Sequence, residues 1–362
     1  MAVADAGRPE TVAQFERASF PGRASEYFGI WIVNVLLTII TFGIYSAWAK
    51  VRRNRYFYGN TVILGRAFEY HATGKQIFIG RVIVFLFFIG IQIIAAIHPL
   101  FVIVTTVLIL AALPWLVQRG LRFNARVTSY RNVRFDFVGS VKGAFVAVVL
   151  GSFVSFLSLG ILAPLASRWL YRYVFGNMRY GDRPFFTEPR VGALYGVWFV
   201  PALMVVIGAV ICGIVGLAMS GAIMAIVNNA DMTEEQMILT FVLGIYLAFF
   251  VVFVVYGLAA LVYRAGVRNV VFSSTKLDDK HELLSDMSRA RYAWIAITNI
   301  IVTVLTLGLM RPWAAVRLAR YMTAHTAIRI HGDIGEVLSS IESTGAAMSA
   351  EYMDMEGIDF GF

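Results

Sequence analysis

Long uncharged apolar runs alternate with short basic linkers along this chain. Seven hydrophobic segments follow one another, at residues 27–49, 77–97, 100–117, 143–167, 191–227, 237–263 and 292–310. A single segment alternates with a close pair, in the order one, two, one, two, one. Several of the runs reach the roughly 20 residues that a helix needs to cross a bilayer. The pattern therefore predicts a chain that crosses a membrane several times.

The three single segments carry the same short motif at fixed spacing. Shifts of 117 and 265 residues relate its three copies, which are Thr41-Phe42-Gly43, Ser158-Leu159-Gly160 and Thr306-Leu307-Gly308. The same shifts relate a basic-aromatic pair behind each motif, namely Arg55-Tyr56, Arg172-Tyr173 and Arg320-Tyr321. Because each copy needs only one gapless shift, we predict an internal repeat.

The distribution of charge conflicts with seven simple crossings. All 31 Lys and Arg residues lie in the N-terminal tail, in the linkers 50–81, 118–142, 168–190 and 264–291, or from Arg311 onward. Seven crossings would export the last two of these linkers, which the positive-inside rule opposes. The conflict disappears if each single segment bends at its small or polar motif and returns to the same side. We therefore predict four full spans, three re-entrant or interfacial hairpins and two cytoplasmic termini, with a plain seven-span protein as the alternative.

Short stretches rich in aromatic and β-branched residues follow the membrane segments, starting at residues 60, 128, 177, 268 and 325. Single short strands are unstable alone, so we expect these to pair. The expected fold is an all-α multi-pass membrane protein with internal repeats and a small cytoplasmic β-strand subdomain. Its expected parts are a cytoplasmic N-terminal tail (1–26), a first repeat (27–142), a second repeat (143–291), a third half-repeat (292–332) and an acidic tail (333–362).

Composition supports the membrane class. Apolar residues make up 59% of the chain, charged residues 15%, and the mean hydropathy is +0.73. Once the membrane segments are set aside, no compact basic domain is left, so the net charge of +9 indicates cytoplasmic linkers and not nucleic-acid binding. The N-terminal segment has charges of both signs and no apolar core, so we expect no cleavable signal peptide.

Candidate chemistry is sparse. Cys212 is the only cysteine, which excludes an intramolecular disulfide and a cysteine-based metal site. No two of the five histidines stand three or four residues apart, and phosphate-binding, dinucleotide and nucleophile motifs are missing from the sequence. We therefore predict no enzyme activity, no catalytic residue, no metal and no cofactor.

A polar stripe runs along each of the three single segments. Its members are Asn34, Thr38 and Thr41 in the first, Ser155 and Ser158 in the second, and Asn299, Thr303 and Thr306 in the third. Such spacing places the side chains on one helical face. The stripe could line a hydrophilic solute path, since irregular backbone at membrane depth has to face water or protein. It could equally join helices together, as Ser, Thr and Asn commonly do in membranes.

Basic and aromatic residues follow each stripe where the segment leaves the membrane. We expect interfacial contacts with lipid phosphates from Arg52, Arg55, Tyr56, Arg172, Tyr173, Arg317, Arg320 and Tyr321. Generic anchoring at the interface and specific binding of an anionic lipid or solute both remain open.

The run TFGIYSAWAKVRRNRYFYGNT, followed by FEYHATG, resembles the YjgN-like family of bacterial inner-membrane proteins. The resemblance is strongest over residues 20–80 and extends, as the repeated motif, to about residue 330. The third copy lacks the Gly and Asn that the first has at positions 59 and 60. The resemblance implies a multi-pass protein of the bacterial inner membrane and leaves its mechanism open.

Two functions from different classes fit these features. The first, which we favour, is a transporter or channel for a small solute, including an anionic one, because many transporters build a central site from repeated units with broken helices. The second is a membrane-organising scaffold that binds anionic lipid headgroups and forms a homo-oligomer without transport. A regulatory partner of another membrane complex is a weaker third hypothesis. Polar stripes that converge on water would favour transport, whereas stripes used in helix contacts would favour the scaffold.

Overall fold

The computed structural model of this chain describes residues 15–98, 101–229, 233–332 and 339. The start of the expected N-terminal tail and nearly all of the expected acidic tail therefore lie outside the described residues. Within the described chain, one order of elements occurs five times in succession: a strand, a leading helix, a returning helix and a second strand.

The first, third and fifth units are nearly equal in length, and the second and fourth are longer because of their longer helix pairs. The elements of the first two units are β1 (Phe15–Arg17), α1 (Ala24–Ile40), α2 (Ser46–Gly59) and β2 (Val62–Ile63), then β3 (Arg66–Tyr70), α3 (Gly74–Ile97), α4 (Phe101–Arg126) and β4 (Thr128–Tyr130). The third unit has a leading helix in three parts, one of them a π-helix: β5 (Val133–Phe137), α5 (Val141–Ala144), η1 (Phe145–Leu150), α6 (Gly151–Leu157), α7 (Ala163–Gly176) and β6 (Met178–Tyr180). The last two units are β7 (Arg183–Thr187), α8 (Val191–Asn229), α9 (Glu234–Ser273) and β8 (Thr275–Leu277), then β9 (His281–Ser285), α10 (Arg289–Leu305), α11 (Arg311–Ala324) and β10 (Thr326–Arg329).

All ten strands form one antiparallel sheet in the order β1-β10-β9-β8-β7-β6-β5-β4-β3-β2. Its two outer strands approach each other, because Ser19 and Val62 exchange backbone hydrogen bonds of 2.8 and 2.9 Å. The sheet is thus nearly closed into a barrel. The expected fold class, an all-α protein with a small strand subdomain, is wrong in this respect. The strands are too short to stand out in sequence, and their pairing across the whole chain makes the sheet large.

Tight turns connect consecutive units. The turn between β4 and β5 consists of Arg131 and Asn132, both with positive φ, and the turn between β2 and β3 consists of Leu64 and Gly65, again with positive φ. Two central residues of this kind form the type I′ turn, whose twist matches that of the flanking strands. Asn and Gly accept such φ values readily, so the turns set the register of the hairpins.

The two faces of the sheet differ in chemistry. Pairs that stand directly opposite each other on one face are aromatic or apolar: Phe68 with Tyr130, Phe135 with Tyr180, and Phe185 with Leu277. Their rings pack into one cluster, in which Phe135 and Tyr180 lie 4.9 Å apart between ring centroids. The other face carries charged pairs, such as Lys276 opposite Glu282. This alternation gives the sheet a buried apolar side and a solvated side.

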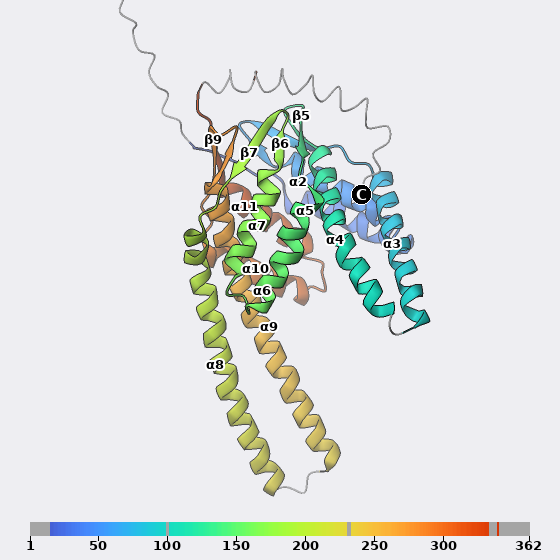
Figure 1. Cartoon of the computed structure of the whole chain (residues 1–362), viewed down its shortest axis with the longest axis vertical. Coiled ribbons are helices and arrows are strands. Elements are labelled where there is room, and N and C mark those ends of the chain that lie inside the picture. Colours follow the sequence, from blue (N-terminus) through green and yellow to red (C-terminus); the bar gives the residue numbers. More distant parts are fainter. Residues whose placement is uncertain (1–14, 99–100, 230–232, 333–338, 340–362) are drawn as a thin grey trace, which may run out of the picture.

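The five helical hairpins extend from the same sheet. Figure 1 shows the strands gathered at one end of the molecule and α8 and α9 reaching furthest from them. Four of the described helices are long and apolar enough to cross a bilayer, over Gly74–Ile97, Phe101–Arg126, Val191–Leu217 and Ile238–Ser273. At 1.5 Å per residue, the 17-residue helices α1 and α10 are only about 26 Å long, shorter than the ~30 Å hydrocarbon core.

Strand pairing is incompatible with the seven-span alternative. In that arrangement the single segment 143–167 would cross the membrane and place β5 and β6 on opposite sides. Instead β5 and β6 are hydrogen-bonded neighbours, with Phe135 opposite Tyr180 and Phe137 opposite Met178. Each hairpin therefore leaves the sheet and returns to it.

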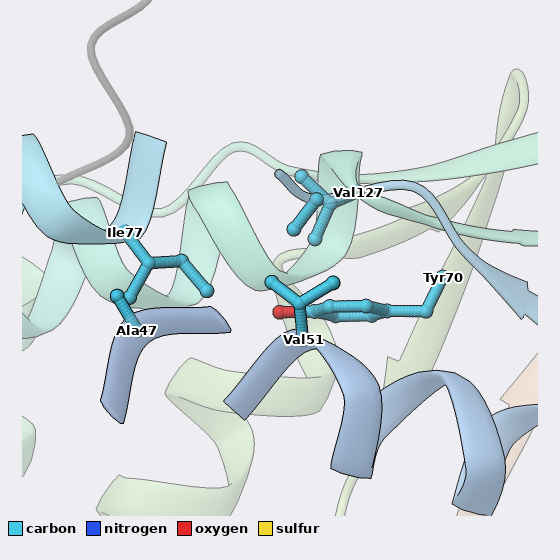
Figure 2. Packing of buried hydrophobic residues seen from close by; sticks show 6 residues of the cluster. Ala47, Val51, Tyr70, Ile77 and Val127 are labelled. Carbon is cyan, nitrogen blue, oxygen red and sulfur yellow. The ribbon is translucent and has the colours of Figure 1, made fainter. Parts of the chain in front are cut away.

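Small apolar clusters fill the angle between the hairpins and the sheet. Figure 2 shows one of them, in which Ala47 and Val51 of α2 pack with Tyr70 of β3, Ile77 of α3 and Val127, which follows α4. The cluster joins the first unit to the second at the sheet end of the helices. Packing is concentrated there, whereas apolar side chains at the far ends of the long helices, such as Ile97 and Ile238, are exposed.

His281 provides a pH-dependent contact in this sheet. Its Nδ1 accepts a hydrogen bond of 3.2 Å from the backbone N–H of His331, and the residue is buried to 2% exposure. Burial, reinforced by the nearby Arg183 charge, lowers the pKa of His281 below its usual value of about 6.5. The unfolded chain therefore binds this proton at a higher pH than the folded chain does.

Acidification should consequently weaken the fold. As pH falls through and below about 6.5, the unfolded chain takes up this proton before the folded chain does, so the free energy of unfolding decreases. We expect the thermal unfolding temperature of the purified protein in detergent to fall between neutral pH and pH of about 5. His281→Asn, which keeps an acceptor but cannot titrate in this range, should show a smaller fall. An identical fall in both proteins would exclude this role for His281.

Candidate functional site

The three short hairpins share one turn geometry. Phe42, Leu159 and Leu307 have φ values of 49°, 51° and 49°, and each is followed by a glycine with φ of 91°, 86° and 91°. The hydroxyl residue in front of each pair closes the turn. Thr41 Oγ1 accepts a hydrogen bond from the N–H of Tyr45, as Ser158 Oγ does from Leu162 and Thr306 Oγ1 from Met310. Each hydroxyl therefore closes its turn by accepting the N–H of the residue that directly precedes the returning helix.

The tips of these turns are apolar and almost fully exposed. Phe42 is 98% exposed, Leu159 87% and Leu307 95%. Large side chains rarely adopt positive φ, so each tip combines backbone strain with exposed apolar surface. Exposure of these apolar side chains is unfavourable in water and favourable in the apolar interior of a bilayer.

Asparagine side chains of the polar stripe bind arginines on the returning helix. Arg52 donates to Asn34 Oδ1 at 3.4 Å, and Arg317 donates to Asn299 Oδ1 at 3.1 Å. Asn299 also donates to the carbonyl oxygen of Ala314 at 3.0 Å. In the second hairpin the same shifts lead to Gly151 and Trp169, so Asn and Arg are replaced together.

The stripe residues do not converge on a common space in the described structure. Asn34 and Asn299 are buried within their own hairpins, and Thr38 Oγ1 donates to the carbonyl oxygen of Asn34 at 2.6 Å. Ser155 lines an open groove, described below, and the carbonyl oxygen of Thr303 accepts from the N–H of Gly308 at 2.7 Å. Most of the expected stripe is thus engaged in turns and helix contacts.

The three tyrosines behind the stripes close the base of their own hairpins. Each hydroxyl donates to a backbone carbonyl at the start of the leading helix. The three bonds are Tyr56 to Arg23 at 2.7 Å, Tyr173 to Ser140 at 2.9 Å and Tyr321 to Ser288 at 3.1 Å. The expected lipid contact of these tyrosines stays a prediction, because the structure instead gives their hydroxyls a protein partner.

Arginines of all five returning helices bind the next unit around the sheet. The bonds run from Arg55 to the carbonyl of Ala72, from Arg122 to that of Phe137, from Arg172 to the Glu188 carboxylate, from Arg268 to the Ser285 hydroxyl and from Arg320 to the carbonyl of Gly22. Each acceptor lies at or just beyond the end of the next unit's first strand. The last bond joins the fifth unit to the first, so the series runs once around the molecule.

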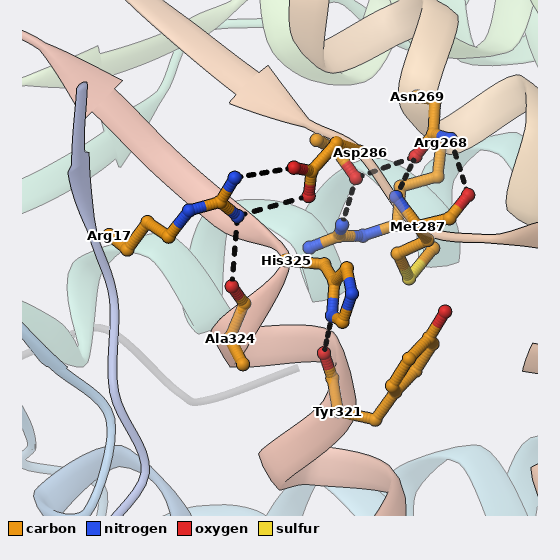
Figure 3. A network of polar contacts seen from close by, with 9 residues as sticks. Arg17, Arg268, Asn269, Asp286, Met287, Tyr321, Ala324 and His325 are labelled. Carbon is orange, nitrogen blue, oxygen red and sulfur yellow. Dashed lines mark hydrogen bonds and ion pairs between the residues drawn. The ribbon is translucent and has the colours of Figure 1, made fainter.

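A second set of contacts secures this last junction. Figure 3 shows Arg17 of β1 between the Asp286 carboxylate and the carbonyl oxygen of Ala324. The hydrogen bonds to Arg17 lower the pKa of Asp286, so this ion pair persists well into the acidic range. Nearby, Asn269 of α9 binds both the N–H and the carbonyl of Met287.

A groove of about 620 Å³ lies between the third short hairpin and the start of α1. Its polar and aromatic lining residues are Arg291 and Trp294 of α10, Trp313, Arg317, Arg320 and Tyr321 of α11, and His325. We call it the basic-aromatic groove. Arg317 lies over the Trp313 ring, 5.1 Å from its centroid, and Trp294 is 63% exposed. Of these residues, Arg317, Arg320 and Tyr321 were expected from the sequence, whereas Arg291 and Trp294 were not, because the spacing within α11 says nothing about which α10 residues face it.

A second groove, of about 610 Å³, lies between the second short hairpin and α9. We call it the hydroxyl groove, since its polar lining consists of Ser152, Ser155, Ser167, Tyr256 and Tyr263. The π-helix η1 lies beside it, and Ser167 hydrogen-bonds Tyr263 at 2.9 Å. No charged side chain lines this groove among the described residues.

One polar cluster on the sheet has the composition of a hydrolytic site but not its geometry. His71 Nε2 lies 2.7 Å from Ser129 Oγ and 3.4 Å from the Glu69 carboxylate. A catalytic triad needs the carboxylate on Nδ1, opposite the nitrogen that faces the serine. Both contacts here are to the same nitrogen, so the cluster does not form a triad. A group of three or more potential metal ligands is likewise absent from residues within the described ranges.

The Asn299–Arg317 contact allows a quantitative test. Asn299→Leu would leave the Ala314 carbonyl without a side-chain donor and Arg317 with one acceptor fewer, so we expect a loss of about 1–3 kcal/mol in unfolding free energy. Arg317→Met and the double variant complete a double-mutant cycle. Unfolding free energies are measured with denaturant in detergent. We expect the double variant to lose clearly less unfolding free energy than the sum of the two single-variant losses. Simple additivity would show that the two side chains do not stabilise the hairpin together.

Comparison with known proteins relates most of the chain to bacterial proteins, among them inner membrane proteins. Residues 15–355 match a family described as bacterial protein of unknown function, DUF898. The chain is 26% identical to inner membrane protein YjgN of Salmonella typhimurium over 366 residues, which cover 90% of each chain. It is 36% identical to YjgN of Escherichia coli O157:H7 over 153 residues, which cover 42% of this chain and 38% of that relative. It is 42% identical to YjgN of Escherichia coli K12 over 125 residues, which cover 34% of this chain and 31% of that relative. No solved structure matches the chain.

Proposed function

Because this chain belongs to the DUF898 family, and its named relatives are inner membrane proteins, we propose that it is a membrane-organising scaffold that bends the bacterial inner membrane. The observation that carries the proposal is the exposure of Phe42, Leu159 and Leu307 at the strained tips of the short hairpins. Inserting three such tips into hydrocarbon would stabilise the bound state by about 2 kcal/mol each.

Unequal helix lengths give the inserted protein a wedge shape. Ten helical segments leave the sheet, counting α5, η1 and α6 as one, but only four of the described helices are long and apolar enough to cross. The leaflet nearest the sheet would therefore hold six more helices than the far leaflet. With a helix diameter of about 10 Å, the extra cross-section is on the order of 500 Å². Such an excess bends a bilayer so that the side bearing the sheet is convex.

The positions of the basic residues support a cytoplasmic sheet. The linkers that contain the strands hold most of the Lys and Arg residues, whereas the apolar windows of the four candidate spans hold at most two charged residues each. The positive-inside rule then favours the sheet and both termini on the cytoplasmic side. In that orientation the membrane would bulge toward the cytoplasm around the protein.

The use of the polar stripes also favours a scaffold. Asn34 and Asn299 bind arginines of their own hairpins, and Thr41, Ser158 and Thr306 accept hydrogen bonds that close the turns in front of the returning helices. Polar side chains engaged in this way join helices and do not line a solute path. The same turn geometry and the same base contacts in three hairpins support the internal repeat expected from the sequence.

Transport, the first function expected from the sequence, stays a prediction. The hydroxyl groove favours it, because Ser155 of the polar stripe lines that groove together with two tyrosines. Replacing Ser152 and Ser155 with Ala should abolish solute flux in proteoliposomes if the groove lies on a transport path. Unchanged flux in a folded variant would remove the groove from any such path.

The wedge predicts that the protein prefers curved membranes. A fluorescently labelled protein is reconstituted with its sheet outside into vesicles of mixed diameter, and its density per membrane area is measured on each vesicle. We expect density to rise as diameter falls. Orientation is checked with an impermeant quencher of the label, because molecules with the sheet inside should show the opposite trend.

A triple variant isolates the contribution of the tips. Asn tolerates positive φ better than Phe or Leu, so Phe42→Asn, Leu159→Asn and Leu307→Asn together preserve the turns while removing their apolar surface. We expect this variant to remain folded in detergent and to lose most of the curvature preference. A curvature preference equal to that of the native chain, or no preference in the native chain, would contradict the proposed function.

A further inference from the structure

Beyond bending the membrane, we infer that the basic-aromatic groove binds a phosphate anion. The groove has the size of a small-ligand site, about 620 Å³, and lies at the sheet end of α10 and α11. Three guanidinium groups line it, from Arg291, Arg317 and Arg320, together with the rings of Trp294 and Trp313. This inference does not depend on the proposed curvature function, since a transporter could hold the same group.

The positive charge of the groove is not neutralised by its own lining. No carboxylate occurs among the described residues that line it. Arginines elsewhere in the described chain commonly have an acidic partner. Examples are Arg17 with Asp286, Arg126 with Asp136, Arg172 with Glu188 and Arg329 with Glu282. The groove therefore stands out because three cations and no carboxylate line it, and the nearby Asp286 is paired with Arg17.

Two of the three arginines are held in place by protein contacts that do not neutralise them. Arg317 donates to Thr298 Oγ1 at 2.7 Å and to Asn299 Oδ1 at 3.1 Å, and Arg320 donates to the carbonyl oxygen of Gly22 at 3.0 Å. All these acceptors are uncharged, so both guanidinium groups keep a full charge and further N–H donors. Arg291 lies in the first turn of α10 and completes the set. Fixed guanidinium groups suit phosphate, because their planar array of donors matches its oxygens.

The other short hairpins lack this combination. In the first, the shift of 265 residues leads from Arg291 to Glu26 and from Trp294 to Gly29, so an acid replaces one cation and an aromatic ring is missing. In the second, a shift of 148 leads to Gly143 and Val146, and Arg172 is paired with Glu188 at 2.7 Å. The third hairpin alone among the three joins all the components of an anion site.

Tryptophan exposure indicates where the anion lies relative to the bilayer. Trp294 is 63% exposed and Trp313 37%. Tryptophan is enriched at headgroup depth, where its ring meets apolar chains and its N–H meets polar groups. Phosphate has two sources at that depth, a lipid headgroup and a free phosphate from the aqueous phase. The shared chemistry is a phosphate anion held by arginines, and experiment has to separate the sources.

Lipid binding by the full-length protein provides the test. Native mass spectrometry of the detergent-solubilised protein, titrated with phosphatidylglycerol, gives an apparent Kd, and phosphatidylcholine serves as the neutral comparison. Arg291→Gln should weaken phosphatidylglycerol binding about five-fold, the effect of one basic residue at a membrane surface. Arg291→Glu, which copies the acid of the first hairpin, should weaken it further.

Arg179 provides a matched control for loss of charge. It lies exposed on β6, outside the groove, so Arg179→Gln removes one positive charge without touching the proposed site. We expect this variant to bind phosphatidylglycerol as the native chain does. Thermal unfolding of every variant is measured alongside. Arg291→Gln should remain folded, because no hydrogen bond or ion pair joins the Arg291 side chain to another residue of the described ranges.

The possible results distinguish free phosphate from a lipid headgroup, and some of them would overturn the inference. Displacement of phosphatidylglycerol by inorganic phosphate, lost in Arg291→Gln, would support a site for free phosphate. Preference for phosphatidylglycerol without such displacement would support a lipid headgroup. Equal binding of both lipids by the native chain would overturn the inference, as would equal phosphatidylglycerol binding by the native chain and folded Arg291→Gln and Arg291→Glu. Neither result bears on curvature preference, so the two proposals fail independently.

Discussion

Backbone pairing of ten very short strands is the constraint on which the rest of this structure depends. The longest strands have five residues, so none would be stable by itself. Each becomes stable only between neighbours that belong to the same unit or to the adjoining one. Every helical hairpin must therefore return to the sheet from which it starts. This requirement, and not the length of the apolar segments, determines that the molecule is built from five hairpins on a common base.

Arginine supplies the second level of organisation. One arginine of every returning helix bonds the beginning of the next unit, and Arg320 to Gly22 completes the circuit. These bonds lie at the sheet end of the helices, where guanidinium groups have access to water and to headgroups. The same residue type can therefore join neighbouring units and remain available to anions. In the second short hairpin Glu188 neutralises Arg172, so this contact is a structural junction. In the third short hairpin, α10 and α11, the arginines have uncharged partners, so the groove that they line is a candidate binding site.

Sequence indicated the hairpins well and the sheet poorly. Thr41 and Gly43, with their counterparts, located all three short turns, and the Lys and Arg distribution indicated that the linkers share one side. The strands were expected as a small subdomain, because two to five residues carry too little alternation to reveal ten partners. Arg317 and Arg320 were expected at an interface from their spacing alone. Arg291 and Trp294 were missed, because only packing of α10 against α11 brings them to the same groove.

Membrane topology is the most direct test of an arrangement in which all five hairpins enter from one side. Cys212 is replaced with Ala, single cysteines are placed at Asp182, Asp279, His98 and Asn229, and intact cells are treated with an impermeant thiol reagent. The account predicts that cysteines at Asp182 and Asp279, in the turns of the sheet, are protected until the cells are opened. Cysteines at His98 and Asn229, at the far ends of α3 and α8, should be labelled from outside. Labelling of either sheet turn in intact cells would contradict a single cytoplasmic sheet and with it the wedge.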